Sequence, residues 1–152
     1  PIGWGALSGL AADPARPGIL YAVSDSYYSM QPTIFTLDVN HAPARIIGAT
    51  RVTRGGANAQ LLDLEGVAAD GEGGFWLASE GRSDRLIPHA LLHVGADGEI
   101  IEQVAFPPEL LAHETRFGAE GVTLIGDTLW IALQRPWADD PEDAVKLLAY
   151  HL

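Results

Sequence analysis

The sequence SGLAAD at residues 8–13 recurs as EGVAAD at residues 65–70 and as EGVTL at residues 120–124. The three glycines of these copies are spaced by roughly 55 residues, a period typical of repeat architectures. Each copy is followed by an apolar segment that carries an aromatic residue at its second position. These segments are LYAVSD at 20–25, FWLASE at 75–80 and LWIALQ at 129–134. The chain therefore consists of three copies of one structural unit.

Each unit has the pattern of an antiparallel β-sheet. Gly, Asp and Pro separate the first two apolar segments, as in turns that join hairpin strands. The aromatic residues Tyr21, Trp76 and Trp130 occupy equivalent positions, so we expect all three in the core. Third strands are expected at 33–38, 90–94 and 146–150, and fourth strands around 45–52 and 99–106. Helix is expected only as one or two turns within residues 107–113.

Four antiparallel strands per unit of about 50 residues are typical of a β-propeller blade. The sequence therefore predicts an all-β fold, a β-propeller with four-stranded antiparallel blades. Propellers close with roughly four to eight blades, so about three blades form only part of a ring. The missing blades are expected from the rest of a longer chain or from a second copy. The predicted boundaries are about 7–54 for blade 1, about 64–107 for blade 2 and about 119–152 for an incomplete blade 3.

Composition excludes several classes of function. Twenty acidic residues against nine basic ones give a net charge of −11, which disfavours nucleic acid and anionic membranes as partners. The absence of cysteine excludes thiolate catalysis and cysteine-ligated metals. No apolar run is long enough for a membrane span. The chain opens at Pro1 without the features of a signal peptide, and we expect the natural N-terminus upstream.

Polar residues recur where the first two strands of each unit meet. In a hairpin, the start of one strand lies beside the end of the next, so all of these residues are expected on one face near the ring axis. They are Ser8, Glu65 and Glu120 at the strand starts, and Asp25, Glu80 and Gln134 at the strand ends. The loops 26–32, 81–88 and 135–143 are expected to form the rim of the same face.

Carboxylates gathered in this way repel one another unless a positive group is bound. Calcium takes six to eight oxygen ligands in flexible geometry and suits such a site. The predicted calcium ligands are Asp25, Glu65, Glu80 and Glu120. The alternative is structural: the carboxylates accept backbone N–H groups or pair with arginines, and the glycines allow close approach at the axis.

Substrate-binding and catalytic residues are expected on this same face of the sheets. Arg82 and Arg135 stand beside the junctions, and their guanidinium groups suit phosphate or carboxylate oxygens. Ser8 is expected to bind substrate with them. Glu65 and Glu120 are the candidate catalytic carboxylates, and His89 on the rim is a candidate acid or base.

The ordered set of these motifs resembles the phytase-like propeller family described as having esterase-like activity. The segments that carry the resemblance are GALSGL at 5–10 with LYAVSD at 20–25, LEGV at 64–67 with SEG at 79–81, and RFGAEGV at 116–122 with LWIA at 129–132. The resemblance implies a bacterial, exported protein of the periplasm or the extracellular space. It also implies a closed ring of six blades and calcium-assisted hydrolysis of phosphate or other esters. A phytate site rich in lysine is not implied, because Lys146 is the only lysine.

Two functional hypotheses follow. In the first, the chain is a calcium-dependent hydrolase of an anionic small-molecule ester, and water activated by the ion attacks the ester. In the second, the same face of a non-catalytic propeller binds a ligand or a protein, because one fold hosts many functions.

Overall fold

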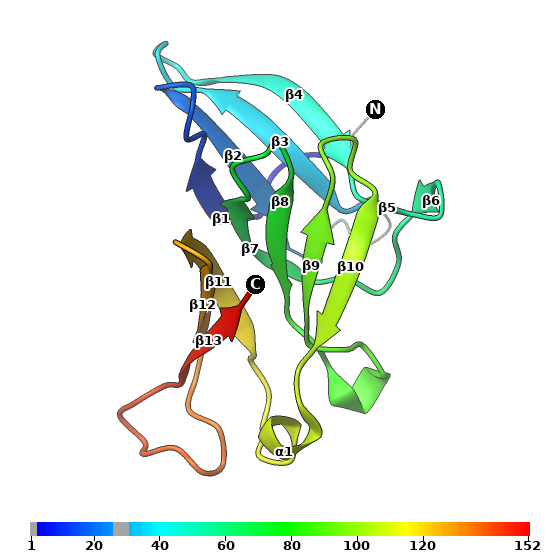
Figure 1. The fold of residues 1–152 in the computed structure, drawn as a ribbon, viewed down its shortest axis with the longest axis vertical. Helices are drawn as coiled ribbons and strands as arrows, with labels where there is room; N and C mark the ends of the chain where they lie inside the picture. The colour runs from blue at the N-terminus through cyan, green and yellow to red at the C-terminus, as the bar shows by residue number, and fades with distance from the viewer. Residues whose placement is uncertain (1–2, 26–30) are drawn as a thin grey trace.

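Three antiparallel sheets stand side by side in the computed structural model, which describes residues 3–25 and 31–152 (Figure 1). The first sheet contains β1 (Leu7–Ala12), β2 (Ile19–Ser24), β3 (Thr33–Asp38) and β4 (Arg45–Arg51) in sequence order. The second contains β7 (Leu64–Ala69), β8 (Phe75–Ser79), β9 (Ala90–Val94) and β10 (Ile100–Ala105). The third contains β11 (Ala119–Ile125), β12 (Thr128–Leu133) and β13 (Leu147–His151).

The remaining elements are short. A two-stranded hairpin of β5 (Thr53–Arg54) and β6 (Ala57–Asn58) links the first two sheets, and the 3-10 helix η2 (Ser83–Arg85) follows β8. The helix α1 (Pro108–Leu111) forms where the prolines predicted a helical turn. No helix in the described ranges is long and apolar enough to cross a membrane. Most of the loop expected at 26–32 lies outside the described residues.

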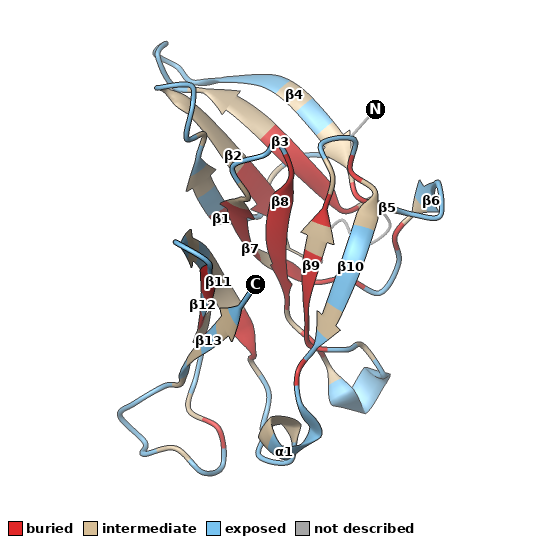
Figure 2. Ribbon diagram, in the orientation of Figure 1, coloured by how far each residue is buried: buried red, intermediate tan, exposed pale blue. Residues whose placement is uncertain are grey.

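The architecture is the all-β arrangement of four-stranded antiparallel sheets that the repeat predicted, and it corresponds to part of a β-propeller. The first strand of each sheet is innermost, so β1, β7 and β11 lie closest to the axis of the partial ring. The sheets pack face to face and form two cores. Figure 2 shows that the second sheet, between its two neighbours, has the most buried strands.

Alternation along β8 divides the second sheet between the two cores. Phe75 and Leu77 pack toward the first sheet, where Val23 and Ile34 are buried. Trp76 and Ala78 point the other way and pack toward the third sheet. Because successive side chains of a strand point to opposite faces, a strand buried on both faces is apolar throughout, and every residue of β8 is buried.

The glycines of the repeat allow the innermost strands to approach closely. A Cβ atom added to Gly9 would lie 2.8 Å from the carbonyl oxygen of Glu65, and one added to Gly66 would lie 2.8 Å from the amide nitrogen of Val122. Gly121 occupies the same position in the third sheet, but its nearest neighbour would be the Ala132 Cβ at 4.0 Å. Two of the three glycines are therefore required by the backbone of the next sheet.

The third of the equivalent aromatic residues lies outside the core. Tyr21 packs edge-on against Phe75 with 4.7 Å between ring centroids, and Trp76 is 3% exposed. The expectation for Trp130 was wrong, because its side chain is 37% exposed. Tyr21 and Trp76 face the next sheet of the repeat, whereas the described residues place no sheet on the Trp130 side of β12.

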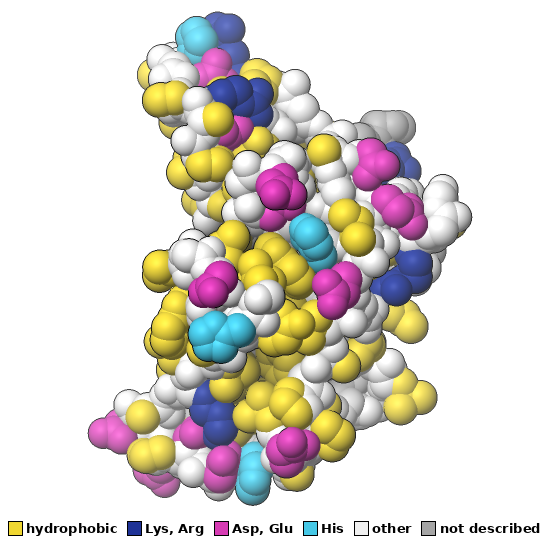
Figure 3. Space-filling view, in the orientation of Figure 1, with side chains coloured by type: hydrophobic (Ala, Val, Ile, Leu, Met, Phe, Trp, Pro, Cys, Tyr) yellow, Lys and Arg dark blue, Asp and Glu magenta, His cyan; other side chains and the backbone are white. Residues whose placement is uncertain are grey.

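The outer strands of the second and third sheets diverge. They enclose a hollow of about 210 Å³ lined by apolar side chains, which is visible as a yellow recess in Figure 3. Its lining includes Leu91, Phe106, Leu110, Ile131 and Leu148. The hollow lies beside β13, the outermost strand of the three-stranded sheet.

Candidate functional site

A β-bulge begins the first strand of each of the three large sheets. The register shifts between Leu7 and Gly9, between Leu64 and Gly66, and between Ala119 and Gly121. The extra residues of the three bulges are Ser8, Glu65 and Glu120. A bulge leaves one residue outside the regular pairing and redirects its side chain. The repeat therefore presents one polar side chain per sheet at the same position near the axis.

The residues that follow the second strands lie at this same end of the sheets. The amide of Asp25 donates to the carbonyl of Ala6 at 3.0 Å, and the amide of Glu80 donates to the carbonyl of Asp63 at 2.7 Å. The equivalent bond in the third sheet joins the amide of Gln134 to the carbonyl of Gly118 at 2.9 Å. Both sets of polar residues thus lie on one face, as the hairpin geometry predicted.

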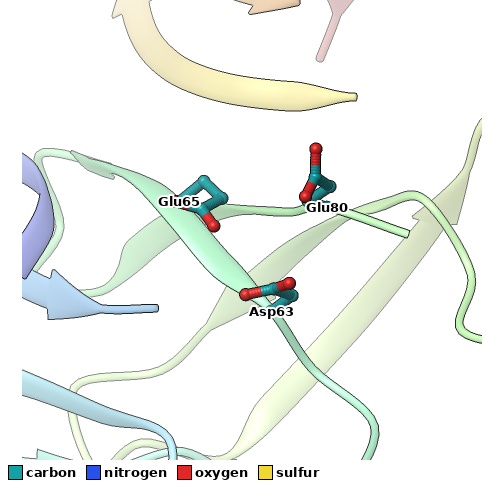
Figure 4. Close-up of side chains that lie close together, drawn as sticks. All are labelled: Asp63, Glu65 and Glu80. Carbon is teal, nitrogen blue, oxygen red and sulfur yellow. The ribbon is translucent and has the colours of Figure 1, made fainter. Parts of the chain in front are cut away.

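Three carboxylates meet beside β7. Oxygen atoms of Asp63, Glu65 and Glu80 lie within 4.8 Å of one another, and Figure 4 shows the three side chains clustered at the entry to β7 and the exit of β8. Asp63 is 9% exposed. Glu65 and Glu80 were predicted from the repeat, whereas Asp63 was missed. Its repeat equivalents are Ala6 and Gly118, so comparison of the copies gave no signal for a carboxylate there.

The other predicted ligands lie outside this group of three. Glu120 projects from the bulge of β11, and its charge acts on both Glu65 and Glu80. Asp25 follows β2 in the first sheet, and it is not a member of the group. The Ser8 hydroxyl, predicted to bind substrate, donates a hydrogen bond to Glu65 Oε2. Ser8 therefore links the first sheet to the carboxylate group in the second.

Burial and mutual repulsion favour protonation of these carboxyl groups. Burial raises the pKa of Glu65 to about 8, the Ser8 hydrogen bond acts against this, and the charges of Asp63, Glu120 and Glu80 add to the increase. Burial is also the main cause that raises the pKa of Glu80 and of Glu120. In the described part of the chain, no arginine or lysine forms an ion pair with Glu65, Glu80 or Glu120. The arginine pairing that we considered for Glu80 is therefore not found.

The raised pKa of Glu65 predicts how stability depends on pH. A carboxyl group whose pKa is higher in the folded chain than in the unfolded chain binds its proton more tightly when folded. In the presence of a chelator, the melting temperature is therefore expected to fall as pH rises from about 5 to about 8. Melting curves across this range check the prediction. Glu65→Gln should flatten the slope, and a wild-type melting temperature that rises with pH would contradict the assignment.

The histidine expected on the rim is inside the molecule. His89 is 1% exposed, and its Nδ1 accepts a hydrogen bond from the Gly81 amide at 3.0 Å. Its Nε2 lies 3.0 Å from Glu114 Oε1. The predicted position was wrong because the loop after β8 and the segment before β11 cover the imidazole of His89. Sequence spacing gives no indication of this closure.

The candidate substrate-binding arginines lie on the loops of the same face. Arg82 Nη2 pairs with Asp84 at 3.0 Å. The guanidinium carbon of Arg135 lies 4.3 Å from the centroid of the Phe117 ring, and that of Arg116 lies 4.7 Å from it. Phe117 directly precedes Gly118, whose amide donates to Glu80 Oε1 at 2.6 Å. Two guanidinium groups are thus held on one ring, next to the segment that binds Glu80.

Comparisons with known proteins agree with this architecture. The family model described as "Phytase-like: Esterase-like activity of phytase" matches residues 2–152. A crystal structure of the glutaminyl cyclase of Myxococcus xanthus superposes with a TM-score of 0.51 at 13% identity, over 82% of this chain and 66% of that one. This chain therefore spans slightly less than two thirds of that structure, and at this identity the likeness shows the fold alone. No curated protein matches the sequence.

Proposed function

We propose that this chain, which belongs to the phytase-like family described as having the esterase-like activity of phytase, is part of a calcium-assisted hydrolase of phosphate or other esters. The observation that carries the proposal is the group of Asp63, Glu65 and Glu80, with oxygens within 4.8 Å of one another. Repulsion within such a group is relieved by a cation, and carboxylate oxygens are the ligands that calcium prefers.

The donor set fits a hard cation. All three side chains offer oxygen, they come from two adjacent strand ends, and one of them is nearly buried. We propose that Asp63, Glu65 and Glu80 hold calcium. Asp25, also predicted as a ligand, does not belong to this group of three, and we do not include it among the proposed ligands. When bound, calcium supplies positive charge that polarises the ester and makes a nearby water more acidic. Ser8 would hold one oxygen of Glu65 in place through its hydrogen bond.

Glu120 is the candidate general base. It projects from β11 beside the group without belonging to it, and burial raises its pKa. A base of this kind accepts the proton of the attacking water, and the alkoxide that leaves the ester takes up a proton in turn. The acid or base role predicted for His89 remains a prediction.

The anionic part of the ester would bind the arginines. Arg116 and Arg135 share the ring of Phe117, and neither forms an ion pair with a carboxylate in the described ranges, although the chain carries 20 acidic residues. Guanidinium groups held in this way suit phosphate or carboxylate oxygens. We propose that Arg135 and Arg116 bind the anion, and that Arg82 joins them when it exchanges Asp84 for substrate.

A calcium titration with two chromogenic esters tests the function. We expect calcium-dependent hydrolysis of p-nitrophenyl phosphate, and Arg135→Gln should raise its KM about tenfold, equivalent to about 1.4 kcal/mol. The KM for the neutral ester p-nitrophenyl acetate should be unchanged in the same variant. The protein should be assayed with all its blades. Absence of turnover with both esters at saturating calcium would contradict the hydrolase proposal.

The alternative is a non-catalytic binding module. Such a module would bind its ligand at the same face as the carboxylates, and a separate cleft of about 530 Å³ lies along the innermost strands at the opposite end. Its lining is mostly apolar and includes Leu10, Val67, Val122 and Leu124. Saturable binding of an ester without turnover in the same titration would support this alternative.

We propose that another blade, from the rest of a longer chain or from a second copy, covers the open side of the third sheet. Gly121 and the exposed Trp130 support this, because their equivalents Gly66 and Trp76 face a neighbouring sheet. We also propose a periplasmic or extracellular location, which rests on family membership.

A further inference from the structure

His89 fills the space between two glycines on either side of it. A Cβ atom added to Gly81 would lie 2.3 Å from the backbone nitrogen of His89 and 2.5 Å from its Cδ2, and one added to Gly118 would lie 2.2 Å from the Nδ1. The imidazole also packs against Phe106, at 5.9 Å between ring centroids, and against Trp137 at 5.7 Å. The ring therefore determines how closely the backbone segments at residues 81 and 118 approach each other.

Both ring nitrogens of His89 face groups of the protein, but only Nδ1 forms a hydrogen bond. The Gly81 amide can only donate, so Nδ1 is the acceptor and carries no proton. In the neutral ring the proton is therefore on Nε2, which faces Glu114 Oε1 at 3.0 Å without the alignment of a hydrogen bond. The other oxygen of Glu114 accepts a hydrogen bond from the Ser83 hydroxyl. Because the ring is buried and Nδ1 is occupied, its contacts favour a structural task over proton exchange with a substrate.

The two glycines are the immediate neighbours of one carboxylate of the group. Gly81 follows Glu80 in the chain, and the Gly118 amide donates to Glu80 Oε1 at 2.6 Å. Gly118 is held in turn by its carbonyl, which accepts the Gln134 amide at 2.9 Å. A change in the separation of the two segments would move the backbone that carries Glu80 relative to the donor that orients it.

We propose that His89 is a positioning residue: by filling the space between Gly81 and Gly118, it orients the Glu80 carboxylate toward Asp63 and Glu65 for calcium binding. The effect of His89 on calcium binding rests on the proposed function, whereas its effect on the Gly118 amide does not. Partners that orient metal ligands typically change metal affinity by about 10–100-fold when they are removed.

Calorimetric titration with calcium alone, without any ester, tests the proposal on the full chain. We expect His89→Gln to weaken calcium binding at least about tenfold. The matched control is His93→Gln. His93 also belongs to the second sheet and pairs with a carboxylate, Asp70 Oδ2 at 3.1 Å, but Asp70 lies at the opposite end of β7 from the carboxylate group. This control should stay within about twofold of the wild type.

Amide hydrogen exchange at Gly118 gives a second readout that needs no calcium. The Gly118 amide should be protected by Glu80 in the wild type and in His93→Gln, and it should exchange at least about tenfold faster in His89→Gln. If His89→Gln does not fold, Glu114→Gln retains the ring and its packing. This milder variant should still weaken calcium binding and speed Gly118 exchange, each by about threefold, because it removes the negative charge that faces Nε2.

The outcomes separate the two proposals. A wild-type chain that binds no calcium contradicts the proposed function, and the role of His89 is then judged on Gly118 exchange. A folded His89→Gln variant with wild-type calcium affinity and wild-type Gly118 exchange overturns the positioning role and leaves the calcium site in place. If only Glu114→Gln folds, wild-type calcium affinity and wild-type Gly118 exchange in that variant likewise overturn the positioning role.

Discussion

Gly66→Ala is expected to destabilise the fold by about 3 kcal/mol, the upper part of the range for overpacked sites. The new methyl group would lie 2.8 Å from the Val122 amide nitrogen and 3.0 Å from the Glu120 carbonyl oxygen. Both atoms belong to the backbone of β11, which cannot rotate away as a side chain can. A loss of this size lowers the melting temperature of a domain of this length by roughly 6–12 °C. The midpoint of urea unfolding measures the change, with the slope of the transition expected to be unchanged.

Gly121→Ala is the matched control. Gly121 follows a bulged glutamate in an innermost strand, as Gly66 does, but its added methyl group would meet only the Ala132 Cβ at 4.0 Å. We expect a change within about 0.5 kcal/mol. Equal effects of the two substitutions would show that strand propensity, not close approach, governs both positions. In a protein where a further blade covers the third sheet, Gly121→Ala should become as damaging as Gly66→Ala.

Glu65→Gln is expected to abolish the stabilisation that calcium gives. At a hundredfold excess over its dissociation constant, calcium should stabilise the wild-type chain by about 2.7 kcal/mol, equivalent to roughly 5–10 °C in melting temperature. The variant keeps the shape of Glu65 but loses the charge, so it should gain little from calcium. In chelator at pH 8 it should melt above the wild type, because it relieves the repulsion from Asp63, Glu80 and Glu120.

Glu102→Gln is the control for this measurement, because Glu102 is an exposed carboxylate of β10 in the same sheet. It should respond to calcium as the wild type does. Identical wild-type melting curves in excess calcium and in chelator would remove calcium from the proposal. The carboxyl groups would then be satisfied by protons, by the Ser8 hydroxyl and by the Gly118 amide.

The fold could be predicted in detail from the sequence. The third strands of the first two sheets, Thr33–Asp38 and Ala90–Val94, lie where the apolar segments placed them, and most other strands agree within a residue or two. The reason is the repeat: three independent copies of one pattern reduce the ambiguity of any single apolar segment. The same repeat predicted that Ser8, Glu65 and Glu120 share one face, because hairpin pairing is a local consequence of the turn and the register.

The candidate site could be predicted only where it follows the repeat. Glu65 and Glu80 were found because their positions are polar in the other copies. Asp63 was missed because its equivalents are Ala6 and Gly118, and His89 was misplaced because its burial depends on packing against segments distant in the chain. The exposure of Trp130 was missed for a related reason, since an aromatic position becomes core only when another sheet covers it.

The sequence by itself therefore determined the strands, their order and the end of the sheets at which polar residues gather. These features depend on local alternation, turn residues and a repeated register. Only the tertiary structure decided which carboxylates meet, that a histidine fills the space between two glycines, and that Gly66 is covered while Gly121 is open. Those features depend on the distances between segments far apart in the chain, which packing between sheets sets and no local pattern encodes.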